Sequence, residues 1–520
     1  MDSDTFFSYL HDHPEKLKPV DWEVDWNDAP LPYKQYQQKP FIRLSREIPE
    51  NFNPTTQTPN IQDIGHLLWY VYGMTKVVHS AIPIDKANSK HQYSTVCRKF
   101  VPSGGALYPN EIYLYLQIKD IPKGVYHYDV AQHALVLLRE GDFAAFITDL
   151  LGKRGTITNC FATVFLSTLF WKNFFKYHNF AYRLQGLDSG VVIGQLLECT
   201  KQVPYQKTVY YQFLDKAANH LLGLTTVQES VYAIITLSAD KQKVQFQQKY
   251  KDVLTSETLC RQLPTIHHDY RLKSKKIHPY PLIDKIHTQS LQNTTQDFTW
   301  ISPKKSDLPK TDETIPLSPN RESIPSFYTI CKRRTSPGMN FTLKPVTKKQ
   351  LTTILQTATE QMDYVNDLSE IADPNERIIA GYFHHIEDIP NGLYVYDSEK
   401  NALSLLRRGD FRTYLQQSTL EPHINIFQVP ICLHIFGKPI YHKEALGVRG
   451  YRTQQMQTGI LVQRLALSAA SIGFGAHPLL GFDTKMIDFL YSFDQNSYKS
   501  LIQIPIGPFQ SSHKWEGILK

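Results

Sequence analysis

The sequence has few cysteines and no segment typical of a membrane protein. Six cysteines are spread over 520 residues without any C-x-x-C pair, which argues against a structural zinc site and a disulfide framework. No apolar run reaches the roughly 18 residues that span a bilayer. The start, MDSDTFFSYLHDHPEK, lacks the basic and apolar regions of a signal peptide. These absences predict a cytoplasmic protein without membrane contact.

Neither sign of charge is in large excess. With 56 basic and 49 acidic residues the net charge is +7, which is weak for a dedicated nucleic-acid binder. The densest basic run, RLKSKK at 271–276, fits an exposed linker better than a binding patch. Twenty histidines occur without H-E-x-x-H or similar spacing, and P-loop and G-x-S-x-G motifs are missing. We therefore expect neither nucleic acid nor a metal.

What the sequence does contain is a long internal repeat. Residues 121–143 and 389–411 are identical at 14 of 23 positions, at an offset of 268. At an offset of 269, four further residues return in the second copy: Tyr182, Arg183, Gln185 and Gly190 match Tyr451, Arg452, Gln454 and Gly459. A spacing this long indicates duplication of a whole domain rather than a solenoid.

The repeat divides the chain into four regions. We expect an extended N-terminal arm at 1–59, a first copy at 60–245, a linker at 246–319 and a second copy at 320–520. The polar, proline-containing linker is expected to be exposed and partly extended. Within the copies, β-branched and aromatic runs such as IYLYLQI at 112–118 alternate with helical patterns at 142–151 and 454–472. This mixture predicts an α+β fold.

A glycine-rich segment, RKFVPSGGALYPNE at 98–111, could contact a ligand closely. Gly104 and Gly105 allow backbone to approach a ligand, and the Ser103 hydroxyl with free N–H groups could bind a flat polar ring or a phosphate. Taken alone, a Gly-Gly turn is more often only a turn between elements.

The motifs together resemble one family. PSGGALYP before a strand, followed by GVYHYD and LREGD, is similar to the flavin-dependent nitroreductase superfamily, and more narrowly to azoline dehydrogenases of the SagB and cyanobactin-oxidase type. WKNFFKYHNFAYR at 171–183 and the N-terminal arm resemble the same group. The resemblance implies a mixed sheet wrapped by helices and an obligatory dimer with FMN at its interface. We therefore expect two tandem nitroreductase-like, FMN-binding domains that form a pseudo-dimer within one chain.

The two copies divide the flavin-binding motifs of this family. The first copy carries the loop residues Pro102, Ser103, Gly104, Gly105 and Tyr108. The second carries a phosphate motif and a late turn, with Arg333, Arg334, Ser336, Pro478 and Gly481. Each copy lacks the motifs of the other, so one complete site and one FMN per chain are expected. The alternatives are weak flavin binding in both copies, or pairing with a second chain.

Lys176 and Tyr177 match the Lys-Tyr pair of the azoline dehydrogenases, which implies that they act as the catalytic base. Burial or a nearby cation must then lower the lysine pKa, and an adjacent ammonium should make Tyr177 more acidic. Neighbours in a helix do not share a face, so the pair should lie at a helix end or in a turn. Without the resemblance, a surface lysine and a core tyrosine would be the simpler interpretation.

The leading hypothesis is an FMN-dependent dehydrogenase that oxidises thiazoline or oxazoline rings to thiazole or oxazole. Its substrate would be a ribosomally synthesised, bacteriocin-like precursor peptide, and its partner the cyclodehydratase complex that forms the rings. The alternative is a general FMN nitroreductase that uses NAD(P)H on small molecules. A third possibility is a scaffold for the modifying complex, with a flavin fold that no longer binds flavin.

Overall fold

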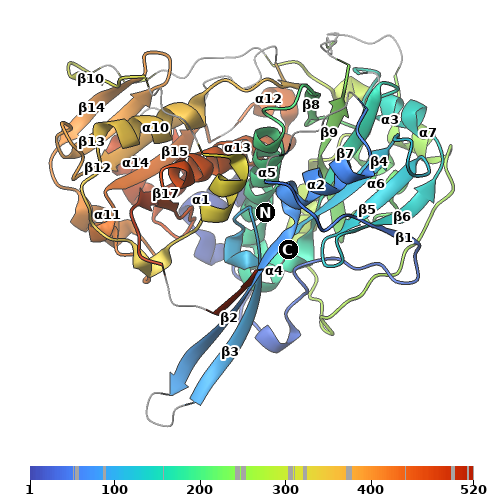
Figure 1. Cartoon of the computed structure of the whole chain (residues 1–520), viewed down its shortest axis with the longest axis horizontal. Helices are drawn as coiled ribbons and strands as arrows, with labels where there is room; N and C mark the ends of the chain where they lie inside the picture. The colour runs from blue at the N-terminus through green and yellow to red at the C-terminus, as the bar shows by residue number, and fades with distance from the viewer. Residues whose placement is uncertain are drawn as a thin grey trace.

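The chain forms two halves that meet along a pair of central helices, as the computed structural model shows (Figure 1). The structure describes residues 1–50, 52, 58–85, 90–155, 157–240, 246, 253–301, 308–309, 311–319, 325–369, 377–439, 441–493, 498–511 and 515–518. For 80–85, 90–94, 515, 516 and 518 it describes the backbone alone.

The first half is built on an eight-stranded sheet of order β1-β6-β5-β4-β7-β9-β8-β11. Its strands are β1 (Phe41–Arg43), β4 (Asn110–Leu116), β5 (Gly124–Asp129), β6 (Ala134–Glu140), β7 (Cys160–Leu169), β8 (Gln206–Tyr210), β9 (Glu229–Ser238) and β11 (Val365–Asn366). All neighbours are antiparallel except β11, which comes from the second half and runs parallel to β8. Strands β4, β7 and β9 are buried along their whole length, so both faces of the sheet are covered.

The second half has a seven-stranded sheet of order β10-β14-β13-β12-β15-β17-β16. Its strands are β10 (Thr314–Pro316), β12 (Ile378–Phe383), β13 (Gly392–Asp397), β14 (Ala402–Arg408), β15 (Ile431–Gly437), β16 (Gly475–Ala476) and β17 (Lys499–Gly507). The repeated hairpin has one register in both sheets, since Tyr128 pairs with Leu135 and Tyr396 with Leu403. The predicted α+β fold is confirmed.

Helices flank both sheets. They are α1 (Ser3–Asp12), α2 (Ile61–Tyr72), α3 (Ala144–Leu150), α4 (Phe170–Tyr177), α5 (Ala181–Cys199), α6 (Asp215–Leu222), α7 (Ser256–Cys260), α8 (Pro281–Gln289), α9 (Phe327–Arg333), α10 (Lys348–Thr359), α11 (Arg412–Ser418), α12 (Lys443–Leu446), α13 (Arg449–Ser471) and α14 (Thr484–Tyr491). Helices α2 and α10 both begin with a capping box, at Asn60 and Thr347. In the described part of the chain, no helix combines the length and apolarity needed to cross a membrane.

The central helices α5 and α13 touch backbone to backbone at the repeated glycines. A Cβ atom on Gly190 would lie 1.8 Å from the carbonyl oxygen of Met456, and one on Gly459 would lie 2.2 Å from that of Leu187. Any larger residue would force the helices apart. Gly190 and Gly459, which recur in the repeat, thus allow α5 and α13 to cross closely. These two helices lie at the centre of the molecule (Figure 1).

The segments that precede the two copies repeat each other as well. The first contains α1, the short helix η2 (Trp26–Asp28) and β1, and the second contains α8, η5 (Thr295–Asp297) and β10 in the same order. In α1, Asp2 accepts a hydrogen bond from the Thr5 N–H, and Phe6 and Leu10 are buried. The expectation of an extended arm is wrong for this helix, because Phe6 and Leu10, spaced four apart, bury one of its faces.

Each arm crosses to the opposite half before its strand returns to its own sheet. The ring of Phe7 stacks on Tyr451 at 4.2 Å, and Thr484 Oγ1 donates to the backbone oxygen of His11. In α8, the buried His287 ring lies 4.9 Å from that of Phe170 in the first half. The linker expected to be exposed therefore includes a helix with a buried face.

A third, small sheet of order β18-β2-β3 was not predicted from the sequence. Strands β2 (Met74–Asp85) and β3 (Lys90–Lys99) form a long antiparallel hairpin, and β18 (Trp515–Ile518) pairs with β2. The hairpin projects from the body of the molecule (Figure 1). Strand β3 leads directly into the glycine-rich loop.

Candidate functional site

A cavity of about 1580 Å³ lies where the two halves meet. The first half contributes the loop after β3 and the end of α4, and the second contributes the segment after α9 and the turn before α14. All twelve residues singled out from the sequence line it: Pro102, Ser103, Gly104, Gly105, Tyr108, Lys176, Tyr177, Arg333, Arg334, Ser336, Pro478 and Gly481. The structure thus brings together segments more than 200 residues apart in the sequence.

The glycine-rich loop has an unusual backbone. Gly105, Ala106 and Tyr108 all have left-handed φ values, of 62°, 57° and 48°. Such values suit glycine but are unfavourable for alanine and tyrosine, so contacts around the loop must hold them. Part of this support is local, because the Tyr108 N–H donates to Ser103 Oγ at 3.0 Å.

The rest of the support comes from Asp188, a buried residue of α5. Ser103 Oγ donates to one carboxylate oxygen of Asp188 at 2.7 Å, and the Gly104 N–H donates to the other at 3.4 Å. Burial raises the pKa of Asp188 to about 7, although these donors and Asn173 act in the opposite direction. No sequence motif points to Asp188.

Lys176 and Tyr177 are the last two residues of α4, so the prediction that they lie at a helix end is confirmed. They face the glycine-rich loop. A Cβ atom on Gly105 would lie 2.8 Å from Tyr177 Oη and 3.2 Å from Lys176 Nζ. The missing side chain of Gly105 is therefore what allows the loop and the pair to come together.

The two side chains differ in their electrostatics. Burial lowers the pKa of the Lys176 ammonium, and the carboxylate of Glu421 partly opposes this. Burial raises the pKa of Tyr177, and Asp188 and Glu421 add to that shift. The expectation that Tyr177 would be more acidic is wrong, because burial and two carboxylates outweigh the neighbouring ammonium. Tyr177 therefore keeps its proton at neutral pH, while Lys176 loses its proton more readily than an exposed lysine.

Four arginines line the cavity. Arg333 ends α9, Arg334 follows it, and Arg98 and Arg46 come from the first half. Arg334 Nε is buried and has no hydrogen-bond partner within the described part of the chain. Burial, followed by repulsion from Arg98, lowers the pKa of Arg334. A buried donor without an acceptor costs about 1–3 kcal/mol, which an anionic ligand here would offset.

The turn with Pro478 and Gly481 closes the cavity from the second half. Nδ1 of the neighbouring His477 accepts the Gly338 N–H at 3.1 Å, and burial lowers the pKa of His477 to about 4, so its ring is neutral. The Gly481 carbonyl accepts the N–H of Leu420. A Cβ atom on Gly481 would lie 2.7 Å from the Glu421 carboxylate, so this position has little room for a side chain.

At the other, pseudo-equivalent position, the backbone N–H groups of the corresponding turn already donate hydrogen bonds to protein groups. At the repeat offset of 268, Tyr211 and Gln212 correspond to Leu479 and Leu480 in the Pro478–Gly481 turn. Their N–H groups donate to the buried carboxylate of Asp367 at 2.8 and 2.9 Å, and Arg154 pairs with the same carboxylate at 2.8 Å. These donors are therefore engaged within the chain.

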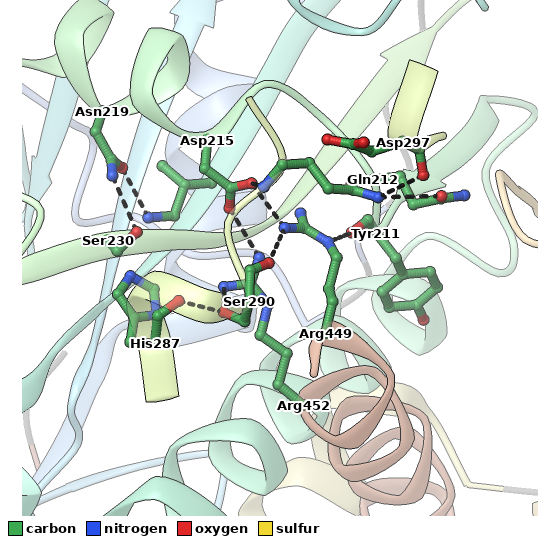
Figure 2. Close-up of polar contacts among 12 residues, drawn as sticks. Tyr211, Gln212, Asp215, Asn219, Ser230, His287, Ser290, Asp297, Arg449 and Arg452 are labelled. Carbon is green, nitrogen blue, oxygen red and sulfur yellow. Dashed lines mark hydrogen bonds and ion pairs between the residues drawn. The ribbon is translucent and has the colours of Figure 1, made fainter. Parts of the chain in front are cut away.

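A second buried ion cluster joins the two halves through Asp215 and two arginines of α13 (Figure 2). Asp215, which corresponds to Asp483 at the same offset, binds Arg449 at 2.7 Å and Arg452 at 2.8 Å. Both arginines come from α13 and also donate to Ser290, which follows α8. All three charged side chains are essentially inaccessible to solvent. Arg452 therefore has a structural role.

Two sheets that flank paired central helices define this chain as having the nitroreductase fold, arranged as a pseudo-dimer within one chain. It is similar to a crystal structure from Anabaena variabilis that is provisionally assigned as a nitroreductase. The similarity covers 98% of this chain and 99% of that one, with a TM-score of 0.74 and 19% identity.

Two further similarities are shorter. One is to a provisionally assigned nitroreductase from Ralstonia eutropha, with a TM-score of 0.32 and 20% identity, and it covers 41% of this chain and 99% of that one. The other is to the E. coli microcin synthetase complex McbBCD, with a TM-score of 0.29 and 18% identity, and it covers 44% of this chain and 82% of that one. No family model and no curated protein matches the sequence.

Proposed function

We propose that this protein is an FMN-dependent dehydrogenase that oxidises thiazoline or oxazoline rings in a ribosomally synthesised peptide. The observation that carries the proposal is the contact between the Lys176–Tyr177 pair and Gly105, inside a cavity built by both halves. The resemblance to azoline dehydrogenases gives the Lys-Tyr pair the role of base and places the PSGG loop against the flavin, so a contact between the two supports the proposal.

The cavity residues fit FMN. Arg334 has a buried nitrogen that needs an acceptor, and Arg333 and Ser336 lie near it, which suits a phosphate. The Gly104–Gly105 backbone can approach a flat ring closely. The cavity of about 1580 Å³ exceeds the roughly 300–1,000 Å³ of pockets for one small ligand, which leaves room for a peptide ring beside a flavin.

Azoline oxidation removes a proton from the ring Cα and a hydrogen with two electrons from Cβ, and the ring becomes aromatic. Bound FMN would supply the two-electron acceptor. Lys176 Nζ takes the Cα proton, because its lowered pKa increases the fraction of free amine. Tyr177, which stays neutral, donates a hydrogen bond from Oη and orients the ring. Glu421 stabilises the ammonium that forms on Lys176.

A general FMN nitroreductase that uses NAD(P)H is the second candidate, and the similarity to the Anabaena variabilis structure over the full chain favours it. For the leading candidate, the partners would be the precursor peptide and the cyclodehydratase complex that forms its rings. The two candidates differ in whether an azoline peptide or NAD(P)H reduces the flavin.

The test uses Lys176→Ala and Tyr177→Phe, with Lys443→Ala as the matched control. Lys443 lies at α12, just before the positions that correspond to the pair, and is partly exposed. We expect K176A to bind FMN but to oxidise an azoline peptide at least about 100-fold more slowly, and K443A to match the wild type. Normal oxidation by K176A would refute the assigned base. Wild-type protein that reduces nitro compounds with NAD(P)H but leaves azolines unchanged would establish the second candidate.

A further inference from the structure

The conformation of the glycine-rich loop depends on a single carboxylate from another element. Asp188 accepts hydrogen bonds from Ser103 Oγ and the Gly104 N–H, and Ser103 Oγ in turn accepts the N–H of Tyr108. Asp188 therefore holds the start of the loop directly and its end through Ser103. Between these points lie Gly105 and Ala106, whose left-handed φ values need such support.

Apart from the loop, the surroundings of Asp188 offer little that would stabilise a buried carboxyl. No ion pair in the described part of the chain involves Asp188, and it is 6% exposed. The groups that face it are Asn173 and Tyr177 from α4, and Tyr72 from α2. A buried carboxyl without a cation is costly unless hydrogen bonds compensate, and the loop supplies those bonds.

The other copy provides a contrast. At the offset of 269, Asp188 corresponds to Gln457 of α13. Gln457 is equally buried, but its Oε1 accepts hydrogen bonds from Arg377 and Tyr441. The second copy also lacks the PSGG sequence. The carboxyl is thus present in the copy that has the loop, and an amide replaces it in the copy that does not.

We infer that Asp188 is a positioning residue of the proposed flavin site: its carboxyl fixes the 103–108 loop in the conformation that brings Gly105 against Lys176 and Tyr177. The inference rests on the proposed function for its catalytic meaning. Asp188 is well placed to hold the loop, because it lies two residues before Gly190, where the backbones of α5 and α13 pack closely against each other. A rigid helix thereby sets the position of a strained loop.

The test compares Asp188→Leu, which removes both acceptors at similar size, with Asp188→Asn, which keeps one. Gln457→Asn is the matched control, since it also alters a buried polar residue of a central helix. Amide hydrogen exchange of the 103–108 segment is measured in the full chain without added ligand. Loss of both acceptors predicts at least about tenfold faster exchange in D188L, a smaller increase in D188N and less than about twofold in Q457N.

A double-mutant comparison tests whether Ser103 carries the effect. Ser103→Ala and D188N should each raise the Kd for FMN, measured by quenching of flavin fluorescence, and the double variant should be clearly less than additive. Unchanged exchange of the loop in both D188L and D188N would overturn the inference. Wild-type protein that binds no FMN would refute the proposed function instead, and the exchange data would still decide the role of Asp188.

Discussion

At the scale of single residues, the two copies have diverged where the chemistry is proposed. At an offset of 269, Lys176 and Tyr177 correspond to Ala445 and Leu446, and Asp188 corresponds to Gln457. Comparing the copies position by position would therefore have pointed to Asp188 from the sequence. Its hydrogen bonds to the loop would not have been predictable, because 84 or 85 residues separate the partners.

The raised pKa of Asp188 makes a prediction about pH. The pKa of Asp188 is about 7 in the folded chain, compared with 3.8 for an aspartate without such contacts. Between pH 3.8 and about 7, the folded state therefore retains a proton that the unfolded state has lost. Stability from this group is fully present below pH of about 4 and decreases as the pH rises towards 7, by an amount on the order of a few kcal/mol. We expect the unfolding midpoint of the wild type to fall relative to that of D188N over this range. Parallel pH profiles of the two proteins would contradict this.

At the scale of elements, the crossing of α5 and α13 depends on the absence of side chains. In contrast to most contacts between helices, the nearest atoms here are backbone atoms, which cannot move aside as a flexible side chain can. The same crossing fixes the relative position of the two halves, and the cavity lies between those halves. Substitutions at the crossing should therefore affect the whole molecule.

We expect Gly190→Ala to destabilise the chain by at least about 3 kcal/mol, because its Cβ would lie 1.8 Å from a carbonyl oxygen. Gly65→Ala in α2 is the matched control. Its Cβ would approach the Leu44 side chain at 3.2 Å, so the change should stay within about 1 kcal/mol. Thermal or denaturant unfolding measures both. Equal stability of the two variants would show that the helices at Gly190 can separate without cost.

Much of this element structure could be predicted from local sequence. The patterns at 112–118, 142–151 and 454–472 match β4, α3 and α13 to within five residues, because the residue types of these runs favour a strand or a helix locally. The exchange of α1 and α8 between halves could not be predicted, because these arms share too little sequence to be recognised as a repeat. The hairpin of β2 and β3 was missed because β3 ends in a polar, charged stretch.

At the scale of the whole molecule, the two pseudo-equivalent positions differ in what fills them. One is a cavity with an Arg334 nitrogen that finds no acceptor among the described residues, and in the other Asp367 accepts hydrogen bonds from the N–H groups of the corresponding turn. The sequence predicted this division of motifs between the copies. It did not predict that Asp367 and Arg154 would occupy the second position, since such contacts depend on the arrangement of the halves.

One FMN per chain is therefore expected, measured as the ratio of flavin absorbance to protein after reconstitution. Arg334→Ala should raise the Kd for FMN by about tenfold or more, because it removes a charged donor to the phosphate. Asp367→Ala serves as the comparison and should leave both the affinity and the ratio unchanged. A ratio near two for the wild type would contradict a single complete site.

The buried cluster of Asp215 also bears on the order in which the protein is made. Arg449 follows Asp215 by 234 residues, and α8, which covers the same region, is also synthesised after the first half is complete. During translation Asp215 therefore emerges before Arg449 and Arg452, the arginines that pair with it in the folded chain. The core of the first half is completed only when the ribosome has produced most of the second half, so the last stretch of synthesis finishes the folding of the first.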